Sequence, residues 1–336
     1  MGQTDPRALR RVLISPISGP PGVGILIFET PLRTLGAALV LAVVACAGKD
    51  AGLGRQDASL EYRVPSLVVM DDAGDTIRLA HPARRVVSLI PATTELLFAI
   101  GAGDAVVGRT IWCEYPADAL AVPAVGDGML PNIEAVVARR PDLVVLYLSS
   151  QNAQAARKLR ELGIAALQVR TDQLSDVPRV GRMLGRLTDH EAGADSMAGA
   201  FTDSLNAATV PSSAHPLRAF VLVWADPPMT VGAGSYLSEL VERAGGENIY
   251  ADLPSSSGQI SVESAVERNP DVVLVLGKAS PTFAKRPEWQ AVPAVREHAF
   301  VFADGTEFGQ PSPRAPSAIR FLAARFRAFQ PAGADP

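Results

Sequence analysis

One helix-to-strand pattern occurs twice in this chain. Residues 133–148 read IEAVVARRPDLVVLYL, and residues 262–277 read VESAVERNPDVVLVLG. Aligned without gaps, the copies share a Glu at the second position and the step Arg-x-Pro-Asp before a run of Val and Leu. Proline lacks an N–H and disfavours a helical conformation at the residue before it, so it ends a helix, and the apolar run is typical of a strand buried on both faces. The repeat therefore predicts the same local fold at two places.

The repeat belongs to a larger duplication of plan. Short apolar strands alternate with helices from RRVVSLIP to IAALQVRT, and again from RAFVLVWADP to AFVFADG. Such alternation indicates parallel βαβ units. The segment between them carries apolar residues at helical spacing, and Thr188-Asp189 is able to cap a second helix within it. We therefore predict an α/β fold with two Rossmann-like lobes joined by a long backbone helix. The alternative is one doubly wound sheet, which the helical interruption near the middle disfavours.

The same pattern sets the expected domain boundaries. The stretch VPSLVVMDDAGDTIRLA, which begins at Val64, alternates around Asp-Asp-Ala-Gly-Asp and predicts a β-hairpin. We expect an N-terminal lobe over 64–177, a connecting helix over 178–210, a C-terminal lobe over 211–330 and a tail over 331–336.

The first 63 residues differ from the rest. The apolar run LGAALVLAVVA over 35–45 follows Arg33 and is well short of the roughly 20 residues that span a bilayer. It ends in Val-Val-Ala before Cys46, which has the form of a bacterial lipobox. We predict a leader over 1–46 with lipidation at Cys46; an ordinary signal peptide with a chance Cys is the alternative. Residues 47–63 are small, polar and Gly-rich, which suits a flexible tether. These features predict a protein that is exported to the periplasm or to the cell surface.

Charge and composition narrow the classes of partner and chemistry. The 31 basic and 35 acidic residues are interspersed, so we expect no nucleic-acid partner. The chain has two Cys, and lipidation of Cys46 would leave Cys113 as a free thiol. The four His are scattered and no CxxC spacing occurs, so we predict no metal site. No complete phosphate loop, G-x-S-x-G motif or acid–base pair is evident, so we expect no enzyme. An enzyme is kept as the alternative of another class.

Four stretches together resemble one protein family. RRVVSLIPATTELLFAIGAGDAVVGRT, PNIEAVVARRPDLVV, AGGENIYAD and QISVESAVERNPDVVLV resemble the substrate-binding proteins of bacterial ABC importers for cobalamin, iron-siderophores and haem. The resemblance runs from about Val64 to Phe329. It implies two α/β lobes joined by a rigid backbone helix, with the ligand in the cleft between them, and an importer permease with its ATPase as partner. The absence of a coiled-coil pattern predicts a monomer.

The resemblance also gives a role to the repeated Glu. It implies that one exposed Glu on each lobe docks against Arg residues of the permease, and the matching positions are Glu134 and Glu263. From the residues alone, a Glu in the first turn complements the positive end of a helix, worth about 0.3–1 kcal/mol, and needs no further role. A two-fold symmetric permease offers the same basic pocket twice, so one carboxylate on each lobe suits it. We expect the docking role.

Loops that follow the strands are the expected place for a ligand, because open α/β sheets bind ligands beyond the carboxyl ends of their strands. The candidate ligand-binding residues are Thr93, Trp112, Tyr115, Met129 and Ser150 in the first lobe, and Trp224, Gln259, Phe308 and Arg314 in the second. Two of the three Trp lie in these loops, and large flat ligands favour aromatic walls with few polar contacts.

The resemblance leaves the ligand class open. Gly128 and Ser257 stand where cobalamin binders of the family carry Trp, and Gln310 stands where an Arg is expected. Tyr115 is the nearest candidate for an axial haem ligand. Arg109 and Arg314 are the candidates for the anionic oxygens of a siderophore. A corrinoid is the first expectation, and an iron complex, siderophore or haem, is the alternative. No cofactor beyond the bound ligand is expected. The alternatives of another class are a corrinoid- or porphyrin-modifying enzyme and a receptor that hands its ligand to something other than an importer.

Overall fold

The first lobe is built on a four-stranded parallel sheet. The structure is a computed structural model that describes residues 67–211, 213–277 and 282–329. The predicted leader, Cys46, the tether and the tail over 331–336 lie outside these residues. The strands run in the order β4-β3-β5-β6. Their bounds are β3 (Val86–Ser88), β4 (Val106–Arg109), β5 (Leu143–Tyr147) and β6 (Ala165–Val169). This confirms the parallel βαβ prediction for the first half of the chain.

Helices cover both faces of this sheet. They are α1 (Pro91–Ala99), α2 (Ile133–Val137), α3 (Ser150–Glu161) and α4 (Asp176–Thr188), with the 3-10 turns η1 (Gly103–Ala105) and η2 (Ala117–Ala121). Alternate strand residues point to opposite faces. Val86 and Val145 therefore pack in one apolar cluster with residues of α1 and α4, while Val144 and Leu146 pack in another with residues of α2 and α3. The lobe is thus a three-layer α/β/α unit.

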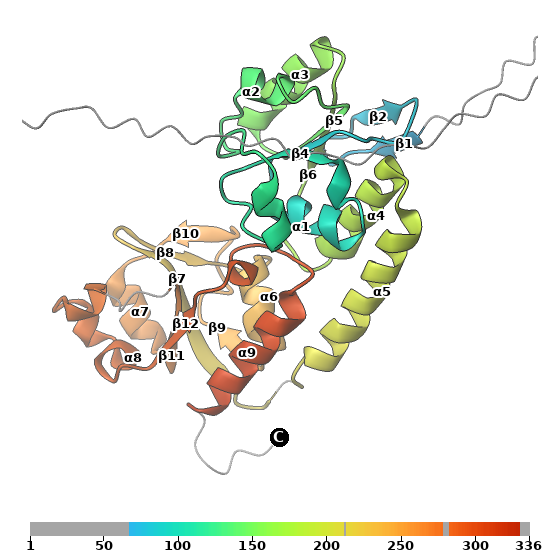
Figure 1. Ribbon diagram of the computed structural model, residues 1–336. Helices are drawn as coiled ribbons and strands as arrows, with labels where there is room; N and C mark the ends of the chain where they lie inside the picture. The colour runs from blue at the N-terminus through green and yellow to red at the C-terminus, as the bar shows by residue number, and fades with distance from the viewer. Residues whose placement is uncertain (1–66, 212, 278–281, 330–336) are drawn as a thin grey trace, which may run out of the picture. The chain divides into compact units, whose positions relative to one another are not determined.

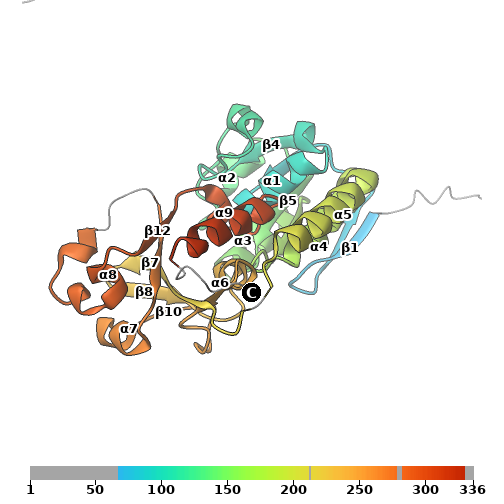
Figure 2. The same cartoon turned by 90° about the horizontal axis from the view of Figure 1, so that it is seen from below.

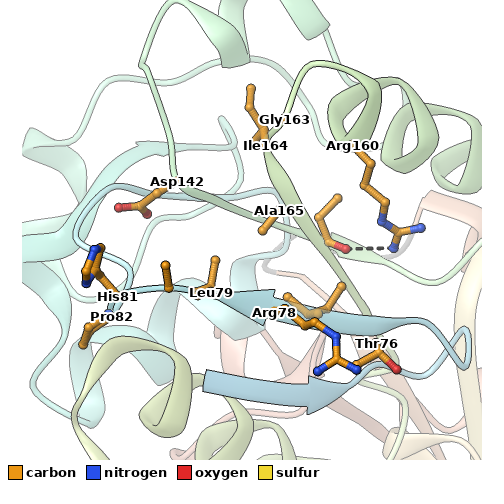
Figure 3. Close-up of a pocket in the computed structure, with 13 residues that line it drawn as sticks. Thr76, Arg78, Leu79, His81, Pro82, Asp142, Arg160, Gly163, Ile164 and Ala165 are labelled. Carbon is orange, nitrogen blue, oxygen red and sulfur yellow. Dashed lines mark hydrogen bonds between the residues drawn. The ribbon is translucent and has the colours of Figure 1, made fainter. Parts of the chain in front are cut away.

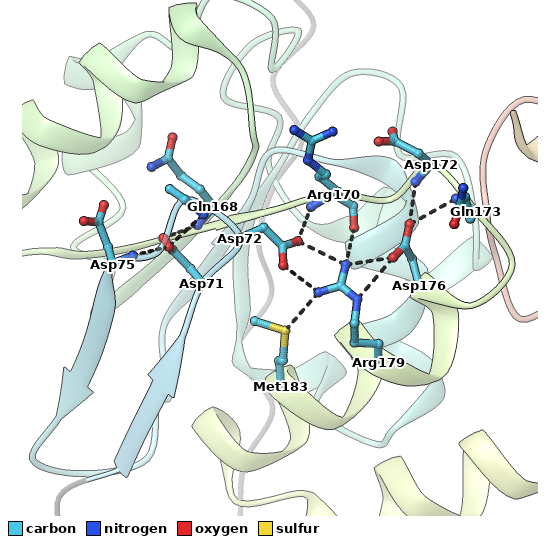
Figure 4. Close-up of polar contacts among 11 residues, drawn as sticks. Asp71, Asp72, Asp75, Gln168, Arg170, Asp172, Gln173, Asp176, Arg179 and Met183 are labelled. Carbon is cyan, nitrogen blue, oxygen red and sulfur yellow. Dashed lines mark hydrogen bonds and ion pairs between the residues drawn. The ribbon is translucent and has the colours of Figure 1, made fainter. Parts of the chain in front are cut away.

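A β-hairpin precedes the first lobe and is fastened to it by ion pairs. β1 (Leu67–Met70) and β2 (Thr76–Leu79) pair antiparallel, which confirms the predicted hairpin. Arg179 of α4 donates hydrogen bonds to Asp72 at 2.7 and 3.0 Å and to Asp176 at 3.1 and 2.8 Å (Figure 4). Although burial disfavours its charge, these carboxylates raise the pKa of Arg179. The hairpin is therefore fixed to the first turn of α4.

The second lobe repeats the plan with a mixed sheet. Its strands run in the order β10-β8-β7-β11-β12, and β9 pairs with the start of β7. The strands are β7 (Leu217–Ala225), β8 (Pro228–Val231), β9 (Gly246–Asn248), β10 (Ser257–Gln259), β11 (Val272–Leu276) and β12 (Phe300–Ala303). The helices are α6 (Tyr236–Arg243), α7 (Val262–Arg268), α8 (Pro293–Arg296) and α9 (Ala315–Arg327), with the 3-10 turns η3 (Thr282–Lys285), η4 (Trp289–Ala291) and η5 (Thr306–Phe308). Trp289, the Trp outside the candidate loops, stacks on Phe220 in the core.

The connector between the lobes contains two helices where one was expected over 178–210. α4 ends at Thr188 and α5 (Glu191–Ala208) begins after Asp189, which adopts the left-handed conformation with φ 63°. The two helices pack along each other (Figures 1 and 2). Gly185 permits this, because a Cβ there would lie 2.5 Å from that of Ala194. The two helices are separated at Thr188-Asp189, the position where the sequence indicates a helix cap. α4 therefore belongs to the first lobe, and α5 alone joins the lobes.

Both lobes belong to a single compact unit. α5 contacts α1 and α4 of the first lobe and α9 of the second, and one apolar cluster contains buried residues of both sheets and of these helices. The lobes therefore share a core beside α5. Among the described residues, no helix combines the length and apolar character that crossing a membrane requires.

The repeated pattern makes the same contacts in each lobe. In the first, the Asp142 carboxylate accepts hydrogen bonds from the backbone N–H of Arg84 at 2.9 Å and of Arg85 at 3.1 Å, and the Arg85 side chain donates to the carbonyl of Arg139 at 2.6 Å. In the second, Asp271 accepts from the N–H of Arg218 at 2.8 Å, and the Arg218 side chain donates to the carbonyl of Arg268 at 2.6 Å. Each Arg-Asp pair joins the beginnings of two neighbouring strands.

Loss of the Asp142 carboxylate should destabilise the first lobe. We expect Asp142→Ala to lower the free energy of unfolding by about 1–3 kcal/mol, because charge-assisted hydrogen bonds to two backbone N–H groups are lost. Urea unfolding followed by circular dichroism measures this. The control Asp203→Ala, at an exposed position of α5, should change it by less than about 0.5 kcal/mol. Equal effects of the two variants would contradict the role given to Asp142.

Candidate functional site

Large apolar side chains stand exposed where strands of both lobes end. In the first lobe, Trp112 is 58% exposed in the loop after β4, and Met129 is 69% exposed in the next loop. In the second, Trp224 near the end of β7 is 61% exposed, and its indole N–H donates to the carbonyl of Asp226 at 2.7 Å. Exposed apolar surface of this kind marks ligand or partner sites. We call Trp112, Met129 and Trp224 the candidate ligand wall, because they stand exposed near the ends of strands, where the family resemblance predicts a ligand.

Exposed polar residues also stand near the ends of strands in each lobe. Ser150 is exposed in the first turn of α3, whose N-cap Ser149 accepts a hydrogen bond from the N–H of Asn152 at 3.1 Å. Gln259 of β10 is exposed and pairs with Met229 of β8, which in turn pairs with Trp224. Gln259 and Trp224 therefore lie on one rung of the second sheet, and paired residues share a face. The second lobe thus presents a neutral amide and an indole on one face of its sheet, with Met229 between them.

Two predicted site residues are buried. Thr93 is fully buried in α1, where its hydroxyl bonds with that of Ser88 at 2.7 Å and donates to the carbonyl of Ile90 at 3.0 Å. Phe308 is buried in the shared core, with its ring 5.5 Å from that of Phe321. Neither side chain reaches the surface that carries Trp112. The structure does not bring these two residues to the wall.

The buried thiol of Cys113 belongs to the interior beneath the wall. Its Sγ lies 3.1 Å from the hydroxyl oxygens of both Thr94 and Thr110. The N–H of Trp112 donates to the Thr110 hydroxyl at 3.2 Å. This network holds the loop that presents Trp112. Among the described residues Cys113 has no disulfide partner.

Arg314 joins the two lobes. It stands at the start of α9, and its guanidinium donates to both carboxylate oxygens of Glu95, a residue of α1 in the first lobe, at 3.0 and 2.7 Å. Gln310 also donates to Glu95, at 3.0 Å, and Glu307 accepts from Arg314. The ring of Tyr115 lies against the guanidinium, 4.0 Å from its carbon to the ring centroid. We call Glu95, Tyr115, Glu307, Gln310 and Arg314 the interlobe clasp.

Electrostatics favour the charged form of Arg314. Glu95 is only 3% exposed. Burial disfavours the charged form of Arg314, but the hydrogen bonds and charges of Glu95 and Glu307 outweigh it and raise its pKa. Burial, aided by the charge of Glu95, also raises the pKa of the neighbouring Tyr236, whose hydroxyl donates to the carbonyl of Glu307 at 2.6 Å. Sequence reasoning missed Glu95, although a single Glu within the apolar stretch ELLFAI was a signal of a buried partner.

Two features of the first lobe bear on ligand chemistry. Arg109 donates to the backbone carbonyls of Thr110 and Ala119, at 2.8 Å each, so it holds its own loop together. Gly128 has φ +85°, and a Cβ there would overlap the carbonyl oxygen of Leu89. The loop path thus requires Gly at a position where a Trp was expected for a cobalamin binder.

The repeated Glu residues occupy matched places. Glu134 and Glu263 are each the second residue of a helix and are exposed. Asn132 and Ser261 cap these helices, accepting from the N–H three residues on at 3.0 and 3.1 Å. Among the ion pairs of the described residues, none involves either carboxylate. Both are therefore available to a partner.

One cavity of the first lobe lies away from the wall. It has a volume of about 560 Å³ and is lined by β2, the beginning of β6 and the side chains of His81, Asp142 and Arg160 (Figure 3). Trp112 follows the carboxyl end of β4, which is parallel to β6 within the sheet. The cavity is therefore at the opposite end of the sheet from the wall, and we do not include it in the site.

A second, polar cavity lies between the lobes. Its volume is about 430 Å³, and Arg170, Asp172 and Gln173 of the first lobe line it together with Gly234 and Ser256 of the second. At its border the Tyr147 hydroxyl donates a hydrogen bond to Asp172 at 2.7 Å. Burial of Tyr147, together with this bond, raises the pKa of Tyr147 to about 12.

No group of three or more His, Cys, Asp or Glu in the described part of the chain is placed to hold a metal ion.

Comparison with known proteins agrees with the fold of two α/β lobes. Residues 86–306 match the family model described as periplasmic binding protein. The substrate-binding lipoprotein YvrC of Bacillus subtilis, an uncharacterised ABC transporter component, is 30% identical over 298 residues, covering 85% of this chain and 94% of that protein. The vitamin B12-binding protein of Vibrio parahaemolyticus is 26% identical over 241 residues, or 71% of this chain and 88% of that one.

A solved structure has the same fold. The periplasmic heme-binding protein RhuT from Roseiflexus sp. RS-1, in its apo form, aligns with a TM-score of 0.66 at 24% identity, covering 74% of this chain and all of that one. The predicted fold of two α/β lobes joined by a backbone helix is thereby confirmed. The chain belongs to the periplasmic binding protein family, among the substrate-binding proteins of ABC transporters.

Proposed function

We propose that this protein captures a corrinoid in the cleft between its lobes and delivers it to an ABC importer. The observation that carries the proposal is the wall of exposed Trp112, Met129 and Trp224 at the carboxyl ends of strands in both lobes. Large flat ligands bury apolar faces against such side chains. Tyr115, 45% exposed, extends this surface. The role is binding and delivery, without catalysis.

The exposed polar groups near the strand ends favour a ligand with neutral hydrogen-bonding groups. Ser150 and Gln259 are exposed at such positions, and hydroxyl and amide groups match the amide side chains of a corrinoid. Arg109 and Arg314, the candidates for binding a siderophore, are already engaged by protein acceptors. A charged anionic ligand would therefore find few free cations at this surface. The vitamin B12-binding relative supports the same choice.

Haem is the second candidate. Tyr115 presents a phenol at the wall, and a Tyr is one of the axial ligands that proteins supply to haem iron. The likeness to a heme-binding protein concerns the fold. Tyr115 would then coordinate iron, whereas in the corrinoid proposal it supplies apolar surface.

Delivery would use Glu134 and Glu263. Each stands exposed at the same place of a repeated helix, one in each lobe. Isolated surface ion pairs are worth about 0–1 kcal/mol. Glu134 and Glu263 would therefore contribute more to the orientation of the protein on the permease than to its affinity for the permease. Lipidation at Cys46 would hold the protein at the membrane, near the permease, as the name of its lipoprotein relative suggests.

Spectral titration identifies the ligand. We expect the wild-type protein to bind cyanocobalamin with a shift of its visible absorption and to bind haemin and a ferric siderophore more weakly. Trp112→Ala and Trp224→Ala should each weaken binding by about 1 kcal/mol or more, because aromatic contact is lost. Leu162→Ala, an exposed apolar position at the end of α3, is the control and should have no effect. Preference for haemin would replace the corrinoid, and binding of none would reject both.

Charge reversal tests the docking residues. We expect Glu134→Lys/Glu263→Lys to keep the wild-type ligand affinity and to lose stimulation of the importer's ATPase, measured with the permease complex in vesicles. The matched control is Glu191→Lys/Glu297→Lys, which changes the net charge equally at two other exposed positions. Undiminished stimulation by the first variant, or equal loss in the control, would exclude specific docking through Glu134 and Glu263.

A further inference from the structure

Arg314 has few free donors with which to bind a ligand. A guanidinium carries five N–H donors. Nε donates to Glu95, Nη2 donates to both Glu95 and Thr306 at 2.7 Å, and Nη1 donates to Glu307. One donor is left, and the ring of Tyr115 lies against the guanidinium. A ligand that bound Arg314 directly would have to displace contacts that the protein already makes.

The contacts of Arg314 instead connect the lobes to the wall. Glu95 is buried in α1, and its carboxylate forms a bidentate pair with Arg314 across the lobe boundary. A bidentate pair fixes the plane of the guanidinium as well as its distance. Tyr115 packs on that plane at 4.0 Å, which is the geometry of a cation–π contact, and remains 45% exposed.

We propose that Arg314 is a positioning residue, held by Glu95 across the lobe boundary, which orients the Tyr115 ring in the ligand wall without contacting the ligand. This rests on the proposed function, in which Tyr115 belongs to the wall. The lobe arrangement and the shape of the wall are then coupled through the interlobe clasp. Ligand affinity depends on the buried Glu95 through this chain of contacts.

The direction in which Glu95→Gln changes the ligand affinity distinguishes positioning by Arg314 from direct contact between Arg314 and the ligand. Full-length variants Glu95→Gln, Arg314→Met, Tyr115→Ala and Arg314→Met/Tyr115→Ala are titrated with cyanocobalamin and haemin. Positioning predicts that Glu95→Gln and Arg314→Met each weaken binding of the preferred probe by about tenfold, and that the double variant binds no more weakly than Tyr115→Ala. Direct contact predicts the reverse: Glu95→Gln frees the guanidinium and preserves or strengthens binding, and the double variant shows additive losses. Either of these two results overturns the proposal.

The second lobe offers a matched control. Arg268 forms a bidentate pair with Asp252, at 2.8 Å for both bonds, and lies 4.5 Å from the centroid of the Tyr250 ring. These three residues belong to one lobe, away from the clasp. Arg268→Met should leave affinity for both probes unchanged. An equal loss in this variant would mean that general destabilisation explains the effect, and would overturn the positioning role.

A spectroscopic measurement tests the clasp even without a ligand. In protein with ¹³C-labelled tyrosine rings, the Tyr115 signal is assigned by Tyr115→Phe. It should shift in both Glu95→Gln and Arg314→Met and stay in place in Arg268→Met. Unchanged Tyr115 signals in the first two variants would overturn the proposal. If wild type binds neither probe while the signal shifts as expected, the proposed ligand class fails and the positioning of Tyr115 stands.

Discussion

The architecture depends on the contact that joins the beginnings of neighbouring strands. In each lobe an Asp carboxylate at the start of one strand accepts a hydrogen bond from the backbone N–H of an Arg at the start of the neighbouring strand. The side chain of this Arg donates to a carbonyl at the end of the helix that precedes the Asp. This fixes the register between β3 and β5 and between β7 and β11. Register in turn decides which residues stand at the carboxyl ends of the strands. The position of the candidate ligand wall therefore follows from contacts at the other end of each sheet.

Two further contacts relate the lobes to each other. Close packing of α4 and α5 and the apolar cluster shared with α9 join the lobes on the side of α5. The Glu95–Arg314 pair joins them again through polar groups. Apolar contact gives most of the stabilisation but little direction, whereas a bidentate ion pair is directional. The lobes are therefore joined both by an undirected apolar contact and by a directional polar one.

Local patterns in the sequence predicted the local structure well. The hairpin, the parallel strands and the repeated helix-to-strand connection follow from the periodicity of apolar residues and from the positions of Pro and Asp. These signals affect the backbone within a few residues. The Glu95–Arg314 pair was not predicted because its members are 219 residues apart and only the fold brings them together. Thr93 and Phe308 follow strands, but place in the chain does not say whether a side chain points inward, and both are buried. The wall itself stays a prediction.

The ligand choice depends on what replaces the missing Trp residues. At Gly128 a positive φ and the nearby carbonyl of Leu89 exclude any side chain, so an aromatic wall at that position would require a different loop path. Met129, the next residue, is instead strongly exposed. A thioether is flexible and polarisable, and it adapts to irregular apolar surfaces where an indole imposes its own shape. A wall of Trp112, Met129 and Trp224 is therefore suited to a large apolar face, with a less exacting fit than three indoles would give.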